Sequence, residues 1–344
     1  MALKDLLAQW PKDLAERVAQ LPREIGELVA QLPQGAAELI TRVPLEIVTG
    51  DAHGRIGWMK RGDPPLPPTE DATGEFFVLL QRLKGGEVVL PHRARGYVYL
   101  TIPGLFAERY PGYLLPTEKR LEERGCHVRR IPINTDRGIE TNAELIASFV
   151  RDMVEADKRV VLIGHSKGGV DGAAAIAMYP EVARAVEALV SMQAPYGGAP
   201  GPHDLVNCPP LHDVIERLLG LVFRGDPGVF RELTYDAREA FIRAHPMPAQ
   251  VRVVSLATSA KPMLSLTTAG PLLYVNRRYQ AECDGLVCPD DAEIPGSRVV
   301  RLRDIDHAGP AFPNPLYPVA GYNPRDVTEA LVTLAVGPDL LLTA

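Results

Sequence analysis

The stretch Val160–Pro180, VVLIGHSKGGVDGAAAIAMYP, decides the predicted fold. It opens with apolar residues typical of a buried strand and continues into an alanine-rich segment typical of a helix. Between the two, Gly164-His165-Ser166-Lys167-Gly168 fits the pattern G-x-S-x-G. In this pattern a serine lies at a tight strand-to-helix turn, and the flanking glycines avoid a collision of Cβ atoms with the turn. We therefore expect Ser166 to be a nucleophile at the start of a helix, with Gly164 and Gly168 as the glycines that the turn requires.

The alternative interpretation of this stretch is a glycine-rich turn with a structural role, for instance a phosphate-binding loop. A Walker-type phosphate loop needs the pattern G-x-x-x-x-G-K-[ST], which the stretch lacks. The small residues after Ser166 also allow a helix to pack close to a sheet, and the helix N-terminus favours negative charge beside the hydroxyl. The sequence thus favours the nucleophile.

Strand-like and helix-like segments alternate on both sides of this turn. The expected strands are 96–102, 127–133, 159–164, 185–192, 251–257 and 297–303, and the expected helices are 113–125, 139–156, 168–179 and 323–336. Such alternation predicts an α/β fold with a mostly parallel, doubly wound sheet that helices cover on both faces.

A serine hydroxyl needs a base that takes its proton. With a nucleophile in this kind of turn, the partners follow in the chain order serine, acid, histidine. His307 in DIDHAGP comes after the last expected strand and is the predicted base, with a surface-loop histidine as the alternative interpretation. The best candidate for the acid is Asp284 in ECDGLVCPDDAEIPGS. The competing carboxylates are Asp290 and Asp291, and Asp304 and Asp306, which are too near His307 in sequence to orient its ring easily.

Four segments together resemble one superfamily: GHSKGGVD, APYGG, CDGLVCPDDAEIPGS and DHAG are similar to the lipase-like branch of the α/β-hydrolases. The resemblance is greatest to plant and bacterial hydrolases with GHSKGGVDAA, SPYGGTP and SDGLV…DAEVPGS, and bacterial triacylglycerol lipases share the DGLV acid loop. It covers roughly residues 95–335. It implies the α/β-hydrolase fold, with Ser166 as nucleophile, Asp284 as acid and His307 as base.

The chain departs from this pattern at the expected oxyanion hole. Lipases of this type carry His-Gly after the corresponding strand, whereas TIPGLFAERYPG has Pro103 before Gly104. We expect the backbone amides of Leu105 and Lys167 to stabilise the oxyanion, since neither donor depends on a side chain.

The first part of the chain has a different pattern. Residues 1–60 contain an 11-residue repeat with proline at its second place, WPKDLAERVAQ, LPREIGELVAQ, LPQGAAELITR and then VPLEIV. An 11-residue period keeps apolar positions on one side of helical segments, and the prolines divide them. We expect an amphipathic helical arm, which either packs on the main domain or binds a lipid or polymer surface. Residues 61–71 form a proline-rich linker, and residues 72–344 the hydrolase domain.

An insertion at about residues 199–248 is expected to form a helical cap or lid. It contains the amphipathic segment LHDVIERLLGLVF, whose apolar face would either be buried in a fixed cap or line an acyl pocket.

Composition excludes several classes of protein. With 37 Lys and Arg against 43 Asp and Glu, the chain has no basic field for nucleic acid. No apolar run is long enough to span a membrane, and the charged N-terminus is no secretory signal, so we expect a cytoplasmic protein, peripheral on a lipid surface if the arm binds one. The four cysteines are expected to be reduced thiols, with a Cys283–Cys288 bridge as the alternative. No nucleotide fingerprint or strong metal-ligand spacing is present, and His203-Asp204 and His212-Asp213 match no such pattern, so neither cofactor nor metal is expected.

These features predict a lipase- or esterase-type serine hydrolase of carboxylic esters with an apolar acyl group, acting through an acyl-enzyme. Two alternatives stay open. One is an intracellular depolymerase of polyesters such as polyhydroxyalkanoates, with the arm as granule-binding device. The other is a non-catalytic lipid-surface protein on a hydrolase scaffold.

Overall fold

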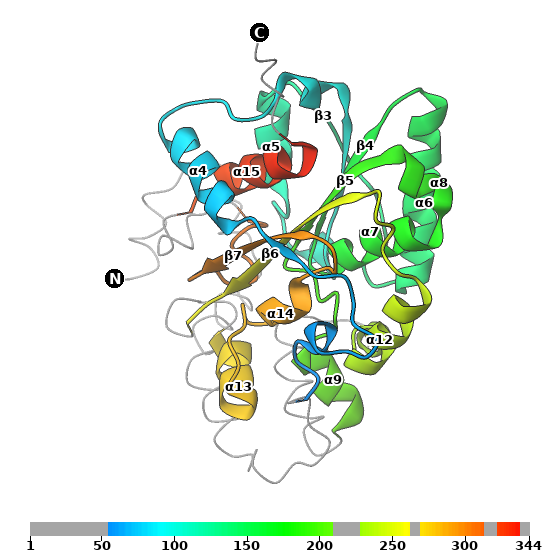
Figure 1. Cartoon of the computed structure of the whole chain (residues 1–344), viewed down its shortest axis with the longest axis vertical. Coiled ribbons are helices and arrows are strands. Elements are labelled where there is room, and N and C mark those ends of the chain that lie inside the picture. The colour runs from blue at the N-terminus through cyan, green and yellow to red at the C-terminus, as the bar shows by residue number, and fades with distance from the viewer. Residues whose placement is uncertain (1–53, 209–227, 262–268, 313–321, 338–344) are drawn as a thin grey trace.

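The computed structural model describes residues 54–208, 228–261, 269–312 and 322–337, and a parallel sheet lies at its centre (Figure 1). Seven strands follow the order β1-β7-β6-β5-β4-β2-β3, and all their pairings are parallel. The strands are β1 (Glu70–Asp71), β2 (Val98–Ile102), β3 (His127–Arg130), β4 (Val160–His165), β5 (Val186–Met192), β6 (Arg252–Ser259) and β7 (Arg298–Arg303). The prediction of a parallel α/β sheet is confirmed.

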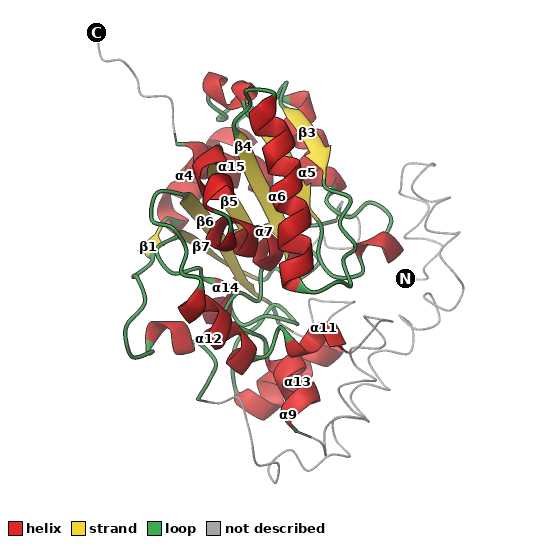
Figure 2. Cartoon of the chain, turned by 90° about the vertical axis from the view of Figure 1, so that its right-hand side faces the viewer, coloured by secondary structure: helices red, strands yellow, loops and turns green. Residues whose placement is uncertain are grey.

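Helices cover both faces of this sheet, as Figures 1 and 2 show. One face carries α6 (Ile139–Glu155), α7 (Lys167–Met178) and α8 (Pro180–Ala185), and the other carries α4 (Thr73–Lys84), α5 (Leu115–Glu123) and α15 (Pro324–Val336). Adjacent residues of a strand point to opposite faces. In β4, Leu162 therefore belongs to the core under α6 and α7, and Ile163 to the core under α4, α5 and α15.

The helix α7 approaches the sheet closely because its first turns are made of small residues. A Cβ atom at Gly168 would lie 2.2 Å from the backbone oxygen of Ile102, and a Cβ at Gly172 would lie 2.9 Å from Cδ1 of the same isoleucine. The glycines after Ser166 thus bring the N-terminus of α7 against the ends of β2 and β4.

Further helices lie beyond the carboxyl ends of the strands, where the sequence predicts a cap (Figure 1). They are α9 (Pro200–Asn207), α11 (Gly228–Arg231), α12 (Tyr235–Ala244), α13 (Ala269–Tyr279) and α14 (Pro289–Ala292). The buried Asp204 of α9 accepts hydrogen bonds from Tyr274 at 2.5 Å and from Arg278 at 2.9 Å, which ties α9 to α13. Glu232 accepts the backbone N–H of Ile139 at 2.5 Å and so ties this region to the start of α6. The predicted amphipathic helix at 211–222 lies outside the described residues.

The segment before α4 packs on the same domain. The sequence predicts an arm up to residue 60, yet Trp58 and Met59 are each only 5% exposed and belong to the core. The indole Nε1 of Trp58 donates to the backbone oxygen of Gly197 at 2.7 Å. Within the predicted linker, Glu70 and Asp71 form β1 and pair with β7. Residues 1–53, which contain the repeat, lie outside the described residues, and their interaction with an apolar surface stays a prediction.

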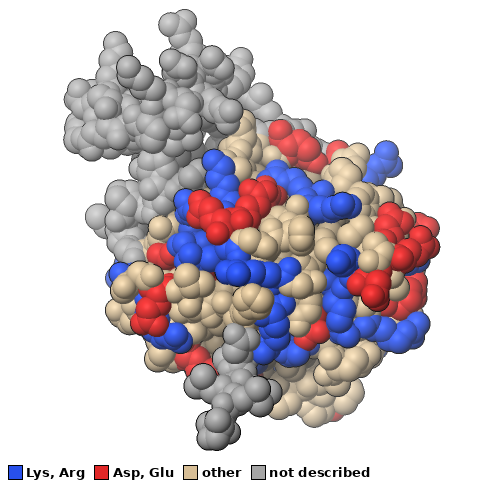
Figure 3. All heavy atoms as spheres, turned by 90° about the horizontal axis from the view of Figure 1, so that it is seen from above, with Lys and Arg blue, Asp and Glu red and all other residues tan. Residues whose placement is uncertain are grey.

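Two features of the described residues concern nucleic-acid-binding and membrane-spanning proteins: the distribution of surface charge and the length and hydropathy of the helices. The face in Figure 3 carries basic and acidic side chains side by side, without a field of one sign. Among the described helices, none has the length and hydropathy that crossing a membrane requires.

Candidate active site

Ser166 lies in the turn between β4 and α7. Its backbone has φ 55° and ψ −131°, a conformation that is strained for a residue with a side chain. The turn is held because the Ser166 N–H donates to the Met192 carbonyl at 2.9 Å. A Cβ atom at Gly164 would lie 2.5 Å from the backbone of both Gly168 and Gly169. This contact explains Gly164, and the 2.2 Å approach of a Cβ at Gly168 to the Ile102 oxygen explains the second glycine of the G-x-S-x-G pattern.

The structure brings Ser166, His307 and Asp284 into one chain of hydrogen bonds. Nε2 of His307 lies 2.9 Å from the Ser166 hydroxyl, and Nδ1 lies 2.9 Å from Oδ2 of Asp284. The other carboxylate oxygen, Oδ1, accepts the backbone N–H groups of Leu286 and Val287, each at 2.9 Å. Asp284 is 1% exposed and His307 is 7% exposed. The arrangement allows His307 to take the hydroxyl proton while the carboxylate fixes the ring tautomer.

Three of the four competing carboxylates, Asp290, Asp291 and Asp306, have other partners. Asp290 pairs with Lys60 at 2.6 Å. Asp291 is buried and accepts the Gly57 N–H at 2.7 Å and the Tyr235 hydroxyl at 2.8 Å. Burial raises the pKa of Asp291 to about 7, against the opposing effect of these two donors. Asp306 accepts the backbone N–H groups of residues 308 and 309 through Oδ1.

The amides that the sequence predicts for an oxyanion hole lie beside Ser166. Lys167 is the first residue of α7, so the helix itself leaves its N–H without an acceptor. Leu105 follows Gly104, where a Cβ atom would lie 2.9 Å from Cβ of Ser166. Within the described part of the chain, neither amide has a hydrogen-bond acceptor. Both residues line the same pocket as Ser166.

The side chain of Lys167 forms an ion pair with Asp171, although the residue directly follows the serine in sequence. Its Nζ lies 2.9 and 2.8 Å from the two carboxylate oxygens of Asp171, one turn along α7. Both side chains are buried, at 1% and 0% exposure. Asn142 of α6 donates to the same carboxylate at 2.8 Å. Burial raises the pKa of Asp171, and the ammonium group of Lys167 opposes that shift.

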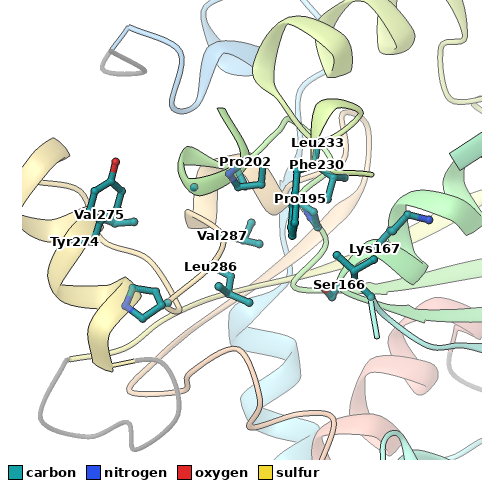
Figure 4. Close-up of a pocket in the computed structure, with 15 residues that line it drawn as sticks. Ser166, Lys167, Pro195, Pro202, Phe230, Leu233, Tyr274, Val275, Leu286 and Val287 are labelled. Carbon is teal, nitrogen blue, oxygen red and sulfur yellow. The ribbon is translucent and has the colours of Figure 1, made fainter. Parts of the chain in front are cut away.

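A pocket extends from Ser166 between the sheet and the surrounding helices (Figure 4). Its walls are made mostly of apolar side chains, which include Leu105, Pro195, Ala199, Pro202, Phe230, Leu233, Pro271, Val275, Leu286 and Val287. The hydroxyl of Tyr274, another lining residue, is engaged with Asp204. Among the described residues that line the pocket, Lys167 is the one with a charged side chain, and its ammonium group is paired with Asp171.

His165 is a residue whose contacts at the site the sequence does not reveal, because it occupies the variable position of the pattern. In the structure it is 1% exposed, and its ring centroid lies 5.0 Å from that of His307. The ring contacts Tyr113 on one side and Gln193 on the other. Their separations of 52 and 28 residues leave no local pattern from which the contacts could be predicted.

Two further kinds of site, a metal-binding cluster and a disulfide bridge, are absent among the described residues. Within the ranges that the structure describes, no group of three or more His, Cys, Asp or Glu could hold a metal ion. All four cysteines are free and buried, so Cys283 and Cys288 do not form a bridge in this structure.

Solved structures resemble this architecture over most of the chain. A metagenomic carboxyl esterase, MGS0156, is 21% identical, with a TM-score of 0.60, over 78% of this chain and 92% of its own. The mature form of the Bacillus licheniformis lipase BlEst2 is 17% identical, with a TM-score of 0.55, over 73% and 93%. The Staphylococcus hyicus lipase is 10% identical, with a TM-score of 0.51, over 72% and 97%.

Comparisons of the sequence itself find no such relatives. No protein-family model matches the chain, and no curated protein matches it. At these identities the structural similarity establishes the fold, and the chain has the α/β-hydrolase fold of carboxyl esterases and lipases.

Proposed function

We propose that this protein is a serine hydrolase of neutral carboxylic esters whose acyl group is apolar. The observation that carries the proposal is the hydrogen-bonded chain Ser166–His307–Asp284 at one end of an apolar pocket. The similarity of the fold to esterases and lipases supports it as an analogy.

In the proposed reaction, Ser166 attacks the ester carbonyl while Nε2 of His307 takes its proton. Asp284 holds the imidazole so that Nδ1 carries a proton and Nε2 can accept one. The amides of Leu105 and Lys167 stabilise the oxyanion. His307 then gives its proton to the leaving alcohol, and water hydrolyses the acyl-enzyme through the same base.

The pocket supports the substrate class. Since the Lys167 ammonium is held by Asp171 and the Tyr274 hydroxyl by Asp204, neither is free to bind a charged group. Transfer of an apolar chain from water to such walls is favourable by about 25 cal/mol per Å² of surface buried. A charged acyl group would lose its hydration without a compensating partner.

The test of the proposal is Ser166→Ala. The wild type should hydrolyse soluble p-nitrophenyl esters and react covalently with a fluorophosphonate probe at Ser166. The variant should keep its melting temperature and lose both reactions. Hydrolysis by folded Ser166→Ala would contradict the proposal, and a wild type that neither reacts with the probe nor cleaves esters would favour the non-catalytic alternative.

A second experiment addresses the acyl group. Figure 4 shows Val275 on the opposite side of the pocket from Ser166. Val275→Trp should lower kcat/KM for octanoyl esters by about tenfold or more while that for acetyl esters changes little. Leu273→Trp is the matched control, because Leu273 lies on the same helix and is 37% exposed. Equal effects of both substitutions would indicate that the acyl chain does not occupy this pocket.

A further inference from the structure

A buried chain of hydrogen bonds connects three loops around Ser166. The Tyr113 hydroxyl lies 2.5 Å from Nδ1 of His165. It also packs against Gly104, where a Cβ atom would lie 2.3 Å from the hydroxyl oxygen. On the far side of the imidazole, Nε2 lies 3.0 Å from the backbone oxygen of His307. Tyr113 is 6% exposed and His165 is 1% exposed, so water has little access to compete for these bonds.

The chemistry of the partners determines where each proton of this chain lies. A backbone carbonyl can only accept, so the contact of Nε2 with the carbonyl of His307 requires a proton on Nε2. Nε2 also faces Oε1 of Gln193 at 3.0 Å, because the amide nitrogen of Gln193 donates to Thr258 and to the carbonyl of Asp306. Nδ1 is therefore the acceptor for the Tyr113 hydroxyl.

These contacts reach the carboxyl ends of three different strands. Gly104 follows β2 and precedes Leu105, whose amide is a proposed oxyanion donor. His165 is the last residue of β4 and precedes Ser166. His307 follows β7 and is the proposed base. Tyr113 and His165 thus link the segments that carry the proposed oxyanion donor, nucleophile and base, and neither side chain lines the pocket.

We propose that Tyr113 and His165 are positioning residues for the ester hydrolysis proposed above, which they support by fixing the backbone at Gly104 and His307. The inference rests on that proposed function. A displacement of about 1 Å in a reacting group can lower a rate by about a hundredfold, so residues that hold these segments in place affect the reaction without touching substrate.

The surroundings of the His165 ring keep it in the required state. Burial, and then the proximity of His307, lower the pKa of His165 to about 3. The ring is consequently neutral near neutral pH, and Nδ1 keeps the lone pair that accepts the tyrosine hydroxyl. The ring of Tyr113 packs edge-on against His165, with 5.4 Å between centroids, and against Phe312 at 5.2 Å.

The experiment compares Tyr113→Phe with Tyr99→Phe in the full chain. Tyr99 is also buried, and its hydroxyl donates to the carbonyl of Ala94 at 2.9 Å, away from the serine turn. Both substitutions remove one buried hydroxyl, so their melting temperatures should fall by similar amounts. We expect Tyr113→Phe to lower kcat for a soluble p-nitrophenyl ester about tenfold or more, with KM nearly unchanged. We expect Tyr99→Phe to keep kcat within about twofold of wild type.

Substitutions at His165 give an independent test. His165→Leu removes the donor to His307 and should lower kcat about a hundredfold. His165→Gln carries an amide N–H that can reach the same carbonyl, so it should recover much of this loss. If His165→Leu does not fold, the Tyr113→Phe comparison still decides the question.

The possible outcomes separate this inference from the proposed function. A wild type that hydrolyses esters, with Tyr113→Phe as active as Tyr99→Phe, would overturn the positioning role alone. The positioning role is also wrong if His165→Gln is no more active than His165→Leu at equal melting temperature. A wild type without ester hydrolysis and without fluorophosphonate labelling at Ser166 would overturn both.

Discussion

Asp284 contacts His307 at two points. Its carboxylate Oδ2 lies 2.9 Å from Nδ1 of the ring, and its backbone oxygen accepts the His307 N–H at 2.9 Å. The side chain and the main chain of the histidine are thus both fixed by one residue. The remaining carboxylate oxygen is held by the N–H groups of Leu286 and Val287, so the orientation of the carboxylate is fixed as well.

This geometry predicts a severe effect of Asp284→Asn. The two amides require an oxygen at the Oδ1 position, so the new NH₂ group must face Nδ1 of His307. The ring then keeps its proton on Nε2 and cannot accept one from Ser166. We expect kcat to fall by about a thousandfold or more, with little change in melting temperature. Asp290→Asn and Asp291→Asn are the controls. If one of them is the severe variant and Asp284→Asn is mild, the acid is assigned to the wrong residue.

The serine turn predicts different outcomes for two glycines. Gly164→Ala places a Cβ atom 2.5 Å from the backbone of Gly168 and Gly169, which cannot move without opening the turn. We expect a loss of about 3 kcal/mol of folding stability, together with the loss of activity. Gly172→Ala instead meets the end of the flexible Ile102 side chain, and alanine favours a helix by about 1 kcal/mol. It should stay within about 1 kcal/mol of wild type in urea unfolding, and equal losses for both variants would contradict the turn geometry.

The buried ion pair predicts that Lys167 contributes more to stability than to the reaction. Lys167→Ala leaves the Asp171 carboxyl buried without its cation, which costs about 3–5 kcal/mol. The backbone N–H is retained, so kcat of the folded fraction should stay within a few-fold of wild type. Urea unfolding and kcat at low temperature measure the two effects separately. The double variant Lys167→Met with Asp171→Asn removes both charges and should regain much of the stability. A large loss of kcat in the stable double variant would give the ammonium group a direct role.

Asp291 predicts a dependence of stability on pH. Its pKa is raised from 3.8 to about 7 by burial, so between these values the folded chain binds more protons than the unfolded chain. The stability that the protonated carboxyl contributes is complete below pH 3.8 and is lost as pH rises through 7, by at most about 1.4 kcal/mol per pH unit. Asp291→Asn lacks this loss. Its free energy of unfolding relative to wild type should therefore be higher at pH 8 than at pH 5.

The matched control for this experiment is Asp236→Asn, because Asp236 is 66% exposed and paired with Arg55. Its difference from wild type should not follow the titration of a buried carboxyl between pH 5 and 8. A pH-independent difference between Asp291→Asn and wild type would show that the carboxyl does not titrate in this range.

Sequence patterns predict most of the sheet, including the edge strand β3, but not the opposite edge strand β1. The strand at 160–165 is recognisable because four apolar residues precede a glycine, and the strands at 186–192 and 252–259 have similar apolar runs. The strand β1 has only the two residues Glu70 and Asp71, both exposed, so no apolar pattern marks it. It forms because its backbone meets the free edge of β7, a contact between segments more than 220 residues apart.

The same distinction applies to the candidate site. Chain order and local pattern are enough to bring Ser166, His307 and Asp284 forward as candidates. Tyr113 and His165 meet only after the sheet has formed, so no spacing in the sequence pairs them. Lys167 and Asp171 are an intermediate case. Their separation of four residues, at the start of an expected helix, is compatible with an ion pair, but we did not predict the pair from the sequence, and nothing in the spacing shows that it is buried.

The hydrogen bond from the Ile139 N–H to the Glu232 carboxylate makes the Ile139 amide a reporter of motions in the region beside the pocket. The first N–H groups of a helix are ordinarily left to solvent, where deuterium replaces hydrogen rapidly. At the start of α6 the carboxylate of Glu232 closes that position instead. Exchange at Ile139 can therefore occur only when the turn at 232 separates from α6. The exchange rate of this single amide, measured in wild type and in Glu232→Gln, reports how often the turn that carries Phe230 and Leu233 separates from the rest of the domain.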